Sequence, residues 1–168
     1  LFMLPDWSEV MSLPVPQRIE KLRDPQVRAH LLARSQSSDA GVFSRLADWG
    51  RYQIGDVYTP ENLVFKGRQV SEIAAERGES DFDTLLDIVI ADDLRTILWP
   101  LPTDDDRASW ELRAEAWERD DVLLGGSDAG AHLDRMCGAS YTTKFIGDCL
   151  RGKKLVSLER GVQMLTQE

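Results

Sequence analysis

Val122-Leu123-Leu124-Gly125-Gly126-Ser127-Asp128-Ala129-Gly130-Ala131-His132 joins a short apolar run to a glycine-rich turn. Three apolar residues bounded by turn residues predict a strand buried on both faces, as in a parallel sheet. In parallel α/β proteins, functional groups lie where strands end and loops begin, and Asp128 occupies such a place. The glycines leave room for a ligand to approach the backbone closely.

Asp128 has two interpretations at this point. An aspartate after a strand is often a helix cap or a turn former. It can equally be a carboxylate that takes part in chemistry. Spacing alone favours neither interpretation over the other.

Composition bounds the class of protein. The chain has 168 residues, of which 42% are apolar and 29% charged, and these values are typical of a globular domain with a real core. A net charge of -9 argues against nucleic acid and anionic membranes as partners. No apolar run is long enough to span a bilayer, and the start of the chain lacks the basic region of a signal peptide. We therefore predict a cytoplasmic protein.

The two cysteines, Cys137 and Cys149, have no histidine or further cysteine at metal-ligand spacing. Reduced thiols are the favoured state, and a Cys137–Cys149 bridge is the alternative.

The first 66 residues are predicted to be mostly helical. Asp6 is expected to cap a turn over residues 7–11, in which Trp7 is a packing residue. Two helices over residues 17–36 break at Asp24-Pro25, where aspartate suits the N-cap and proline the first helical position. His30 lies on the second helix and is interpreted as structural. Partial alternation predicts strands over 49–57 and 61–65.

The second part begins with two amphipathic helices. One covers residues 69–77 and ends at Gly78, and the next begins after Ser80 as its cap. A buried strand is predicted over 94–99. The run Asp104-Asp105-Asp106 resembles a metal-binding cluster, but capping of the next helix, over 106–119, is the favoured interpretation.

Residues 94–126 then follow the order strand, helix, strand. A parallel βαβ unit with a right-handed crossover is the expected arrangement. Further helices are predicted over 140–150 and after Ser157. The last one carries an apolar side formed by Leu158, Val162 and Leu165.

Three stretches together resemble the D-aminoacylase (N-acyl-D-amino-acid deacylase) branch of the metal-dependent amidohydrolases. The first is Leu4 to Val10 continuing into Leu22 to Arg28, and the second is Gly67 to Ala74 followed by Asp81 to Ile90. The third and most specific is Leu124 to His132, followed by Leu155 to Glu159 and Gln163 to Thr166. Their order and spacing span nearly the whole chain.

The resemblance implies a TIM-type (β/α)8 barrel with one or two zinc ions at its strand ends. Asp128 matches the aspartate after the last barrel strand, which helps to hold the metal and acts as general base on the attacking water. His132 is implied to face the active site, toward an N-acyl amino acid substrate, although a structural loop histidine is an equally good interpretation. We expect an α/β, helix-rich fragment, with a helical insertion and connecting strands in 1–66 and the last βαβ units in 67–168.

The family's His-x-His pair and its ligands from the middle strands are absent, because His30 and His132 are the only histidines. A catalytic zinc normally has three protein ligands, so we expect the fragment not to retain zinc and to be inactive by itself. The competing hypothesis is a non-catalytic helical interaction or regulatory module in which Asp128 is only a cap. An aspartyl-phosphate enzyme with Asp128 as nucleophile ranks below both. Exposed apolar edges of an excised barrel piece would favour self-association.

Overall fold

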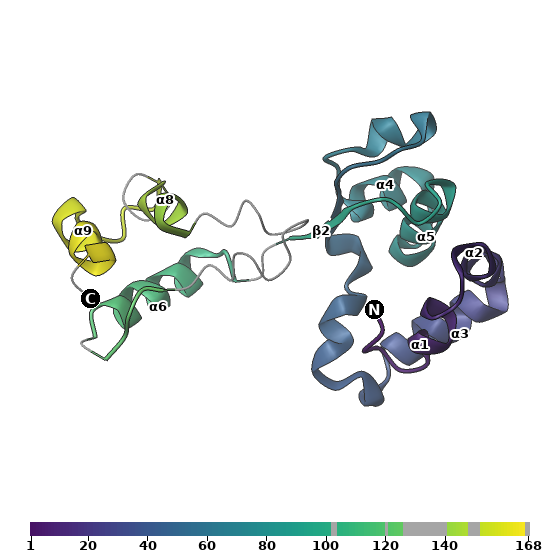
Figure 1. Cartoon of the computed structure of the whole chain (residues 1–168), viewed down its shortest axis with the longest axis horizontal. Helices are drawn as coiled ribbons and strands as arrows, with labels where there is room; N and C mark the ends of the chain where they lie inside the picture. The colour runs from purple at the N-terminus through teal and green to yellow at the C-terminus, as the bar shows by residue number, and fades with distance from the viewer. Residues whose placement is uncertain (102–103, 120, 126–140, 148–151, 167–168) are drawn as a thin grey trace. The chain divides into compact units, whose positions relative to one another are not determined.

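The computed structural model describes residues 1–101, 104–119, 121–125, 141–147 and 152–166. The chain divides into two compact units, Leu1–Leu101 and Pro102–Glu168, which are described separately below (Figure 1). Helices dominate, and a small two-stranded sheet is the only sheet within the described ranges. This content is compatible with an α/β fragment. In the same ranges no helix has the length and apolar character needed to cross a membrane. The expected division between 66 and 67 stays a prediction.

The first unit contains five α-helices, three 3-10 helices and two strands among its described residues. The α-helices are α1 (Trp7–Met11), α2 (Val15–Arg23), α3 (Pro25–Ser35), α4 (Val70–Arg77) and α5 (Asp81–Ala91). The 3-10 helices are η1 (Ser38–Ala47), η2 (Trp49–Arg51) and η3 (Pro60–Phe65), and the strands are β1 (Tyr52–Ile54) and β2 (Leu98–Pro100).

Local signals set most helix ends as the sequence predicts. The Asp24 carboxylate accepts a hydrogen bond from the Gln26 amide at 2.8 Å, and Pro25 opens α3. The Ser80 hydroxyl caps α5 by accepting from the Asp83 amide at 3.0 Å. Gly78 ends α4 with a φ of 67°, a left-handed conformation that glycine adopts without steric cost. Asp6 is the exception, because it precedes α1 but its side chain makes no capping hydrogen bond.

The core of the first unit is built around aromatic rings from three segments. Trp7 of α1 stacks on Trp49 of η2 with centroids 5.3 Å apart, and Phe82 of α5 lies 5.2 Å from Trp49. The Trp7 indole N–H donates to the Leu31 carbonyl of α3 at 3.1 Å. Trp7 is therefore the packing residue that the sequence indicates, and its contacts join α1 to η2, α3 and α5.

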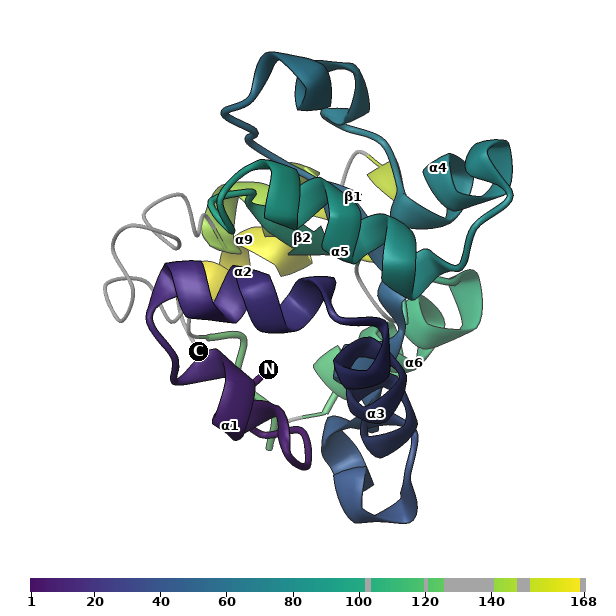
Figure 2. The same cartoon turned by 90° about the vertical axis from the view of Figure 1, so that its right-hand side faces the viewer.

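The helices α4 and α5 supply the remaining core. Val70, Ile73 and Ala74 form the buried face of α4, at the spacing that the sequence predicts. The buried residues of α5 are Phe82, Thr84, Leu85, Leu86, Ile88, Val89 and Ile90. Helix α5 contacts both α4 and α2, and it lies centrally among these helices in Figure 2.

The sheet differs from the prediction. The strand expected over 49–57 is reduced to β1, because Trp49–Arg51 form a 3-10 turn. Residues 61–65 are helical and not a strand: the buried Asn62 donates its side-chain amide to the Ile88 carbonyl at 2.9 Å and anchors a 3-10 turn opened by Pro60. The strand predicted over 94–99 covers Leu98–Pro100.

The parallel βαβ unit is wrong for the described residues. β2 pairs antiparallel with β1, with Gln53 opposite Trp99 and Ile54 opposite Leu98. Val122–Gly125 form no strand, and Leu123 is 67% exposed. A strand needs a neighbouring strand to satisfy its backbone, and this apolar run has none within the described part of the chain.

The second unit contains α6 (Arg107–Trp117), α8 (Tyr141–Phe145) and α9 (Leu158–Thr166) among its described residues. Phe145 and Met164 are the buried residues of its apolar cluster in the described ranges, and Trp117 meets Phe145 edge-on at 5.3 Å. The apolar side predicted for α9 is turned differently, because Leu158 and Val162 are exposed while Gly161 and Met164 are buried. The helix predicted over 140–150 is helical at Tyr141–Phe145.

Replacement of Trp7 by phenylalanine tests the role of its indole N–H. Trp7→Phe keeps an aromatic ring but leaves the buried Leu31 carbonyl without this donor. We expect the free energy of unfolding to fall by about 1–3 kcal/mol, measured by urea denaturation. Phe2→Leu, at an exposed position, is the control and should change stability by less than about 0.5 kcal/mol. Equal losses in both variants would contradict this role.

Candidate functional site

Asp128 and His132, the two predicted site residues, lie outside the described residues, as do Cys137 and Cys149. The structure does describe the residues that precede them. The Val122 amide donates to the Arg119 carbonyl at 3.4 Å, just after α6. Leu124 is half-buried against the cluster of Phe145 and Met164. The segment that leads to Asp128 is thus anchored by one apolar side chain.

The acidic run before α6 acts as a cap, as the sequence favours. The Asp106 carboxylate accepts from the Ser109 amide at 3.0 Å and from its hydroxyl at 2.7 Å. These hydrogen bonds, led by that from the backbone amide, hold the pKa of Asp106 below its usual value. Asp104 contributes its backbone carbonyl, which accepts from Arg113 at 2.7 Å.

Asp105 is part of a charged group around Trp110. It accepts from the Trp110 indole N–H at 2.6 Å and lies 3.4 Å from the Lys153 ammonium. The Trp110 hydrogen bond, followed by Lys153, lowers the pKa of Asp105. Arg113 and Lys153 lie over the indole ring at 4.6 and 4.7 Å from its centroid. These contacts tie α6 to the segment that precedes α9, and this group has one carboxylate and two cations.

Within the described residues, no three histidine, cysteine, aspartate or glutamate side chains gather closely enough to hold a metal ion. His30 lies on α3, and its Nε2 is 2.9 Å from Asp6 Oδ2. Arg34 donates to the same oxygen at 2.9 Å. This group ties the start of the chain to α3, which agrees with the structural interpretation of His30.

Asp92 is a fully buried carboxylate at the end of α5. Four donors point at it: the amides of Tyr58 and Thr59 and the hydroxyls of Thr59 and Thr96. Burial acts to raise the pKa of this carboxyl, but the hydrogen bonds favour its charged form and hold its pKa below the usual value. The Asp92 charge therefore fixes the loop before η3 against the turn that leads into β2.

Backbone conformation after Asp92 is unusual. Asp93 and Leu94 have φ values of 53° and 58°, in the left-handed region that residues with a Cβ rarely adopt. The Leu94 amide donates to the Val89 carbonyl at 2.7 Å, which closes the end of α5. Arg95 then lies over the Tyr58 ring, 4.9 Å from its centroid. These contacts, together with Asp92, hold the chain in this strained turn.

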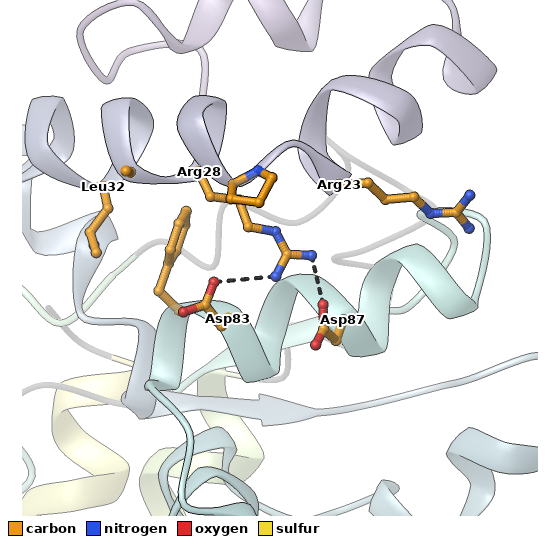
Figure 3. Close-up of a pocket in the computed structure, with 8 residues that line it drawn as sticks. Arg23, Arg28, Leu32, Asp83 and Asp87 are labelled. Atoms are coloured by element: carbon orange, nitrogen blue, oxygen red, sulfur yellow. Dashed lines mark hydrogen bonds and ion pairs between the residues drawn. The ribbon is translucent and has the colours of Figure 1, made fainter.

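A pocket of about 600 Å³ lies beside α3 and α5 (Figure 3). Arg28 reaches across it and donates to Asp83 at 3.2 Å and to Asp87 at 2.6 Å. Its Nε also donates to the Leu22 carbonyl at 2.6 Å. Pro25, Ala29, Leu32 and Phe82 supply apolar lining. Because three acceptors already engage Arg28, its guanidinium ties α3 to α5 and to the end of α2. Arg23 also lines the pocket.

Sequence reasoning missed the buried Asp92 and the two ion pairs that Arg28 forms with Asp83 and Asp87. Asp92 receives donors from residues 33 and 34 positions earlier, and Arg28 meets partners 55 and 59 positions later. Such separations leave no local pattern. The available signal for Arg28 was the pair Asp83 and Asp87, which lie four residues apart and hence on one face of α5.

Comparison with known proteins gives relatives but no family. An uncharacterized protein of Mycobacterium tuberculosis and one of Mycobacterium bovis are each 33% identical to this chain over 106 residues. The match covers 61% of this chain and 17% of each relative, so it spans a small part of the relatives' own length. No protein-family profile and no solved structure matches the chain.

The pH dependence of stability tests the Asp92 contacts. Because folding lowers the pKa of Asp92, its stabilisation is complete above the pKa of the unfolded carboxyl and is lost as pH falls through the folded value. Asp92→Asn should lower the free energy of unfolding at pH 7 by about 1.5–3 kcal/mol. The loss should shrink as the pH is lowered below about 4.

Urea denaturation of both proteins at a series of pH values measures this difference. Asp93→Asn is the control, because Asp93 is the neighbouring carboxylate and is exposed. A loss for Asp92→Asn that stays constant down to pH 2 would mean that the charge of Asp92 does not stabilise the fold.

Proposed function

We propose that this chain is part of a zinc-dependent amidohydrolase that hydrolyses the amide bond of N-acyl-D-amino acids or related compounds. In this proposal Asp128 is the metal ligand and general base, and His132 faces the substrate. The observation that carries it is the stretch Leu124 to His132, in which a Ser-Asp-Ala-Gly-Ala-His sequence follows an apolar run and two glycines. The order and spacing of the two other matching stretches support it.

The proposed parent fold is a TIM-type barrel, of which this chain supplies the last strands and a helical insertion. The helix-rich content is compatible with such a piece. The antiparallel pairing of β2 with β1 differs from a barrel strand pair.

The donor set of this chain does not fit a complete zinc site. Zinc sites in enzymes usually have three protein ligands, mostly histidines. The sequence has two histidines, and His30 pairs with Asp6 in the first unit. Asp128 is one ligand, so the others must come from outside these residues. Bound zinc would polarise the substrate carbonyl and lower the pKa of a water.

The length of the relatives supports this division of the site. The matched region is 17% of each mycobacterial protein, which leaves most of those chains to supply other elements. A second candidate function is a helical interaction module. The observation that favours it is the first unit, whose buried core is made entirely of residues between Leu4 and Ile90.

Asp128→Asn in the longer protein that contains this chain tests the proposed chemistry. The amide keeps the size of the side chain but cannot act as a base at neutral pH. We expect kcat on an N-acetyl-D-amino acid to fall at least about 100-fold. The measurement is release of the free amine, with the N-acetyl-L-amino acid as a second substrate.

Asp121→Asn is the matched control, because Asp121 is an exposed carboxylate seven positions earlier that pairs with Arg119 at 2.6 Å. It should leave kcat unchanged. The 168-residue chain by itself should show no turnover and no stoichiometric zinc after dialysis. Turnover or near-stoichiometric zinc that disappears in Asp128→Asn would show that the chain completes the site without further ligands.

A further inference from the structure

Within the described residues β2 is an edge strand, and its backbone groups on the side of β1 are hydrogen-bonded to β1. The Gly55 amide donates to the Ile97 carbonyl at 2.7 Å, and the Leu101 amide donates to the Arg51 carbonyl at 3.2 Å. On the far side of β1, Ile54 bonds to Arg68 and Gly67 at 2.9 and 2.7 Å. β1 is therefore central, with β2 on one side and residues 67–69 on the other.

The alternation of an antiparallel ladder fixes which groups of β2 point outward. Residues 97, 99 and 101 face β1, so the amide and carbonyl of Leu98 face away from it. The carbonyl of Pro100 points the same way, while proline has no amide hydrogen to offer. Thr96 faces outward by the same alternation, so the segment Thr96–Leu101 presents two donor–acceptor pairs, those of Thr96 and Leu98, and the further acceptor of Pro100 along its outer edge.

The side chains along this edge are apolar and uncharged. Trp99 is 49% exposed and Ile97 is 37% exposed, and they share the face of the sheet that is opposite to the core. The Trp99 ring lies against Gly55, whose missing Cβ leaves room for it. Leu98 packs against the core cluster on the other face. From Thr96 to Leu101 the sequence Thr-Ile-Leu-Trp-Pro-Leu contains no charge, and charges are one feature by which natural edges avoid pairing. Proline is another such feature, so pairing at Pro100 can use only its carbonyl.

We propose that the outer edge of β2 binds β2 of a second copy of this chain, antiparallel and about a two-fold axis at Leu98. In this register the Leu98 amide and carbonyl exchange hydrogen bonds with Leu98 of the other copy. The Thr96 amide donates to the Pro100 carbonyl of the other copy, and the same bond recurs by symmetry. The proline therefore supplies an acceptor at the position where an acceptor is needed.

The side chains that come opposite each other when β2 pairs with itself support a second copy of this chain as the partner of this edge. With Leu98 opposite Leu98, Ile97 lies opposite Trp99 of the other copy, and Trp99 opposite Ile97. Both pairs are non-hydrogen-bonded pairs, in which cross-strand side chains approach most closely. An aromatic residue opposite a β-branched one is a favourable cross-strand pair. A shift of the pairing register by one residue would place outward-facing backbone groups opposite inward-facing ones and separate Ile97 from Trp99 of the other copy. The proposal is independent of the amidohydrolase function.

Sedimentation velocity of the 168-residue chain over a range of concentrations tests it. We expect a reversible monomer–dimer equilibrium. Ile97→Glu and Trp99→Lys should each weaken dimerisation by about tenfold or more, since each substitution counts twice in a two-fold interface. The double variant Ile97→Glu/Trp99→Lys places a glutamate opposite a lysine at both pairs, and it should recover at least part of the lost affinity.

Leu63→Lys is the matched control, because Leu63 is an exposed apolar residue of η3 away from this edge, and it should leave the dimerisation constant unchanged. Recovery in the double variant also shows that the substituted chains fold. A chain that stays monomeric at every concentration would overturn the proposal. So would a dimer that Ile97→Glu and Trp99→Lys leave intact, or one that Leu63→Lys weakens equally.

Discussion

The stacking of Trp7 on Trp49 is the contact on which the first unit depends. It joins a five-residue helix at the start of the chain to a 3-10 turn more than forty residues later. Phe82 closes the group from α5, and the Trp7 N–H satisfies a carbonyl of α3. Neither α1 nor η2 is long enough to be stable by itself, because isolated helices shorter than about 12 residues are marginal in water. Their order therefore comes from burial of these rings.

A second constraint is the buried charge of Asp92, which fixes the position of the segment that leads into β2. The carboxylate holds the loop at Tyr58 and Thr59, and through Thr96 it also holds the start of the strand segment. The strained turn at Asp93 and Leu94 redirects the chain from α5 toward the sheet. A well-ordered edge can bind another strand at lower entropic cost than a mobile one. The same buried charge thus links the stability of the fold to the proposed pairing surface.

Sequence patterns predicted the parts of the fold that local chemistry decides. The breaks at Asp24-Pro25 and Gly78 and the cap at Ser80 depend on residues within one helical turn, and all three are confirmed. The strand predicted over 61–65 was wrong, because the buried bond from Asn62 to α5 outweighs the apolar alternation there. The parallel βαβ unit was wrong because strand pairing depends on which partner is present, and β1 pairs with β2. The proposed site at Asp128 rests on a local motif and stays a prediction, whereas the contacts of Asp92 depend on partners too distant to leave a pattern.

The two units differ in how much apolar surface they bury. The first has a core of sixteen buried residues, including two tryptophans. Among the described residues of the second unit, Phe145 and Met164 are the buried members of its cluster, and large apolar side chains such as Leu112, Leu123 and Leu158 are more than half exposed. Small units that bury little apolar surface need additional contacts for stability. The second unit also carries Asp128, so in the proposed longer enzyme additional contacts would matter most for this part of the chain. This agrees with the proposal that the remaining zinc ligands come from outside these residues.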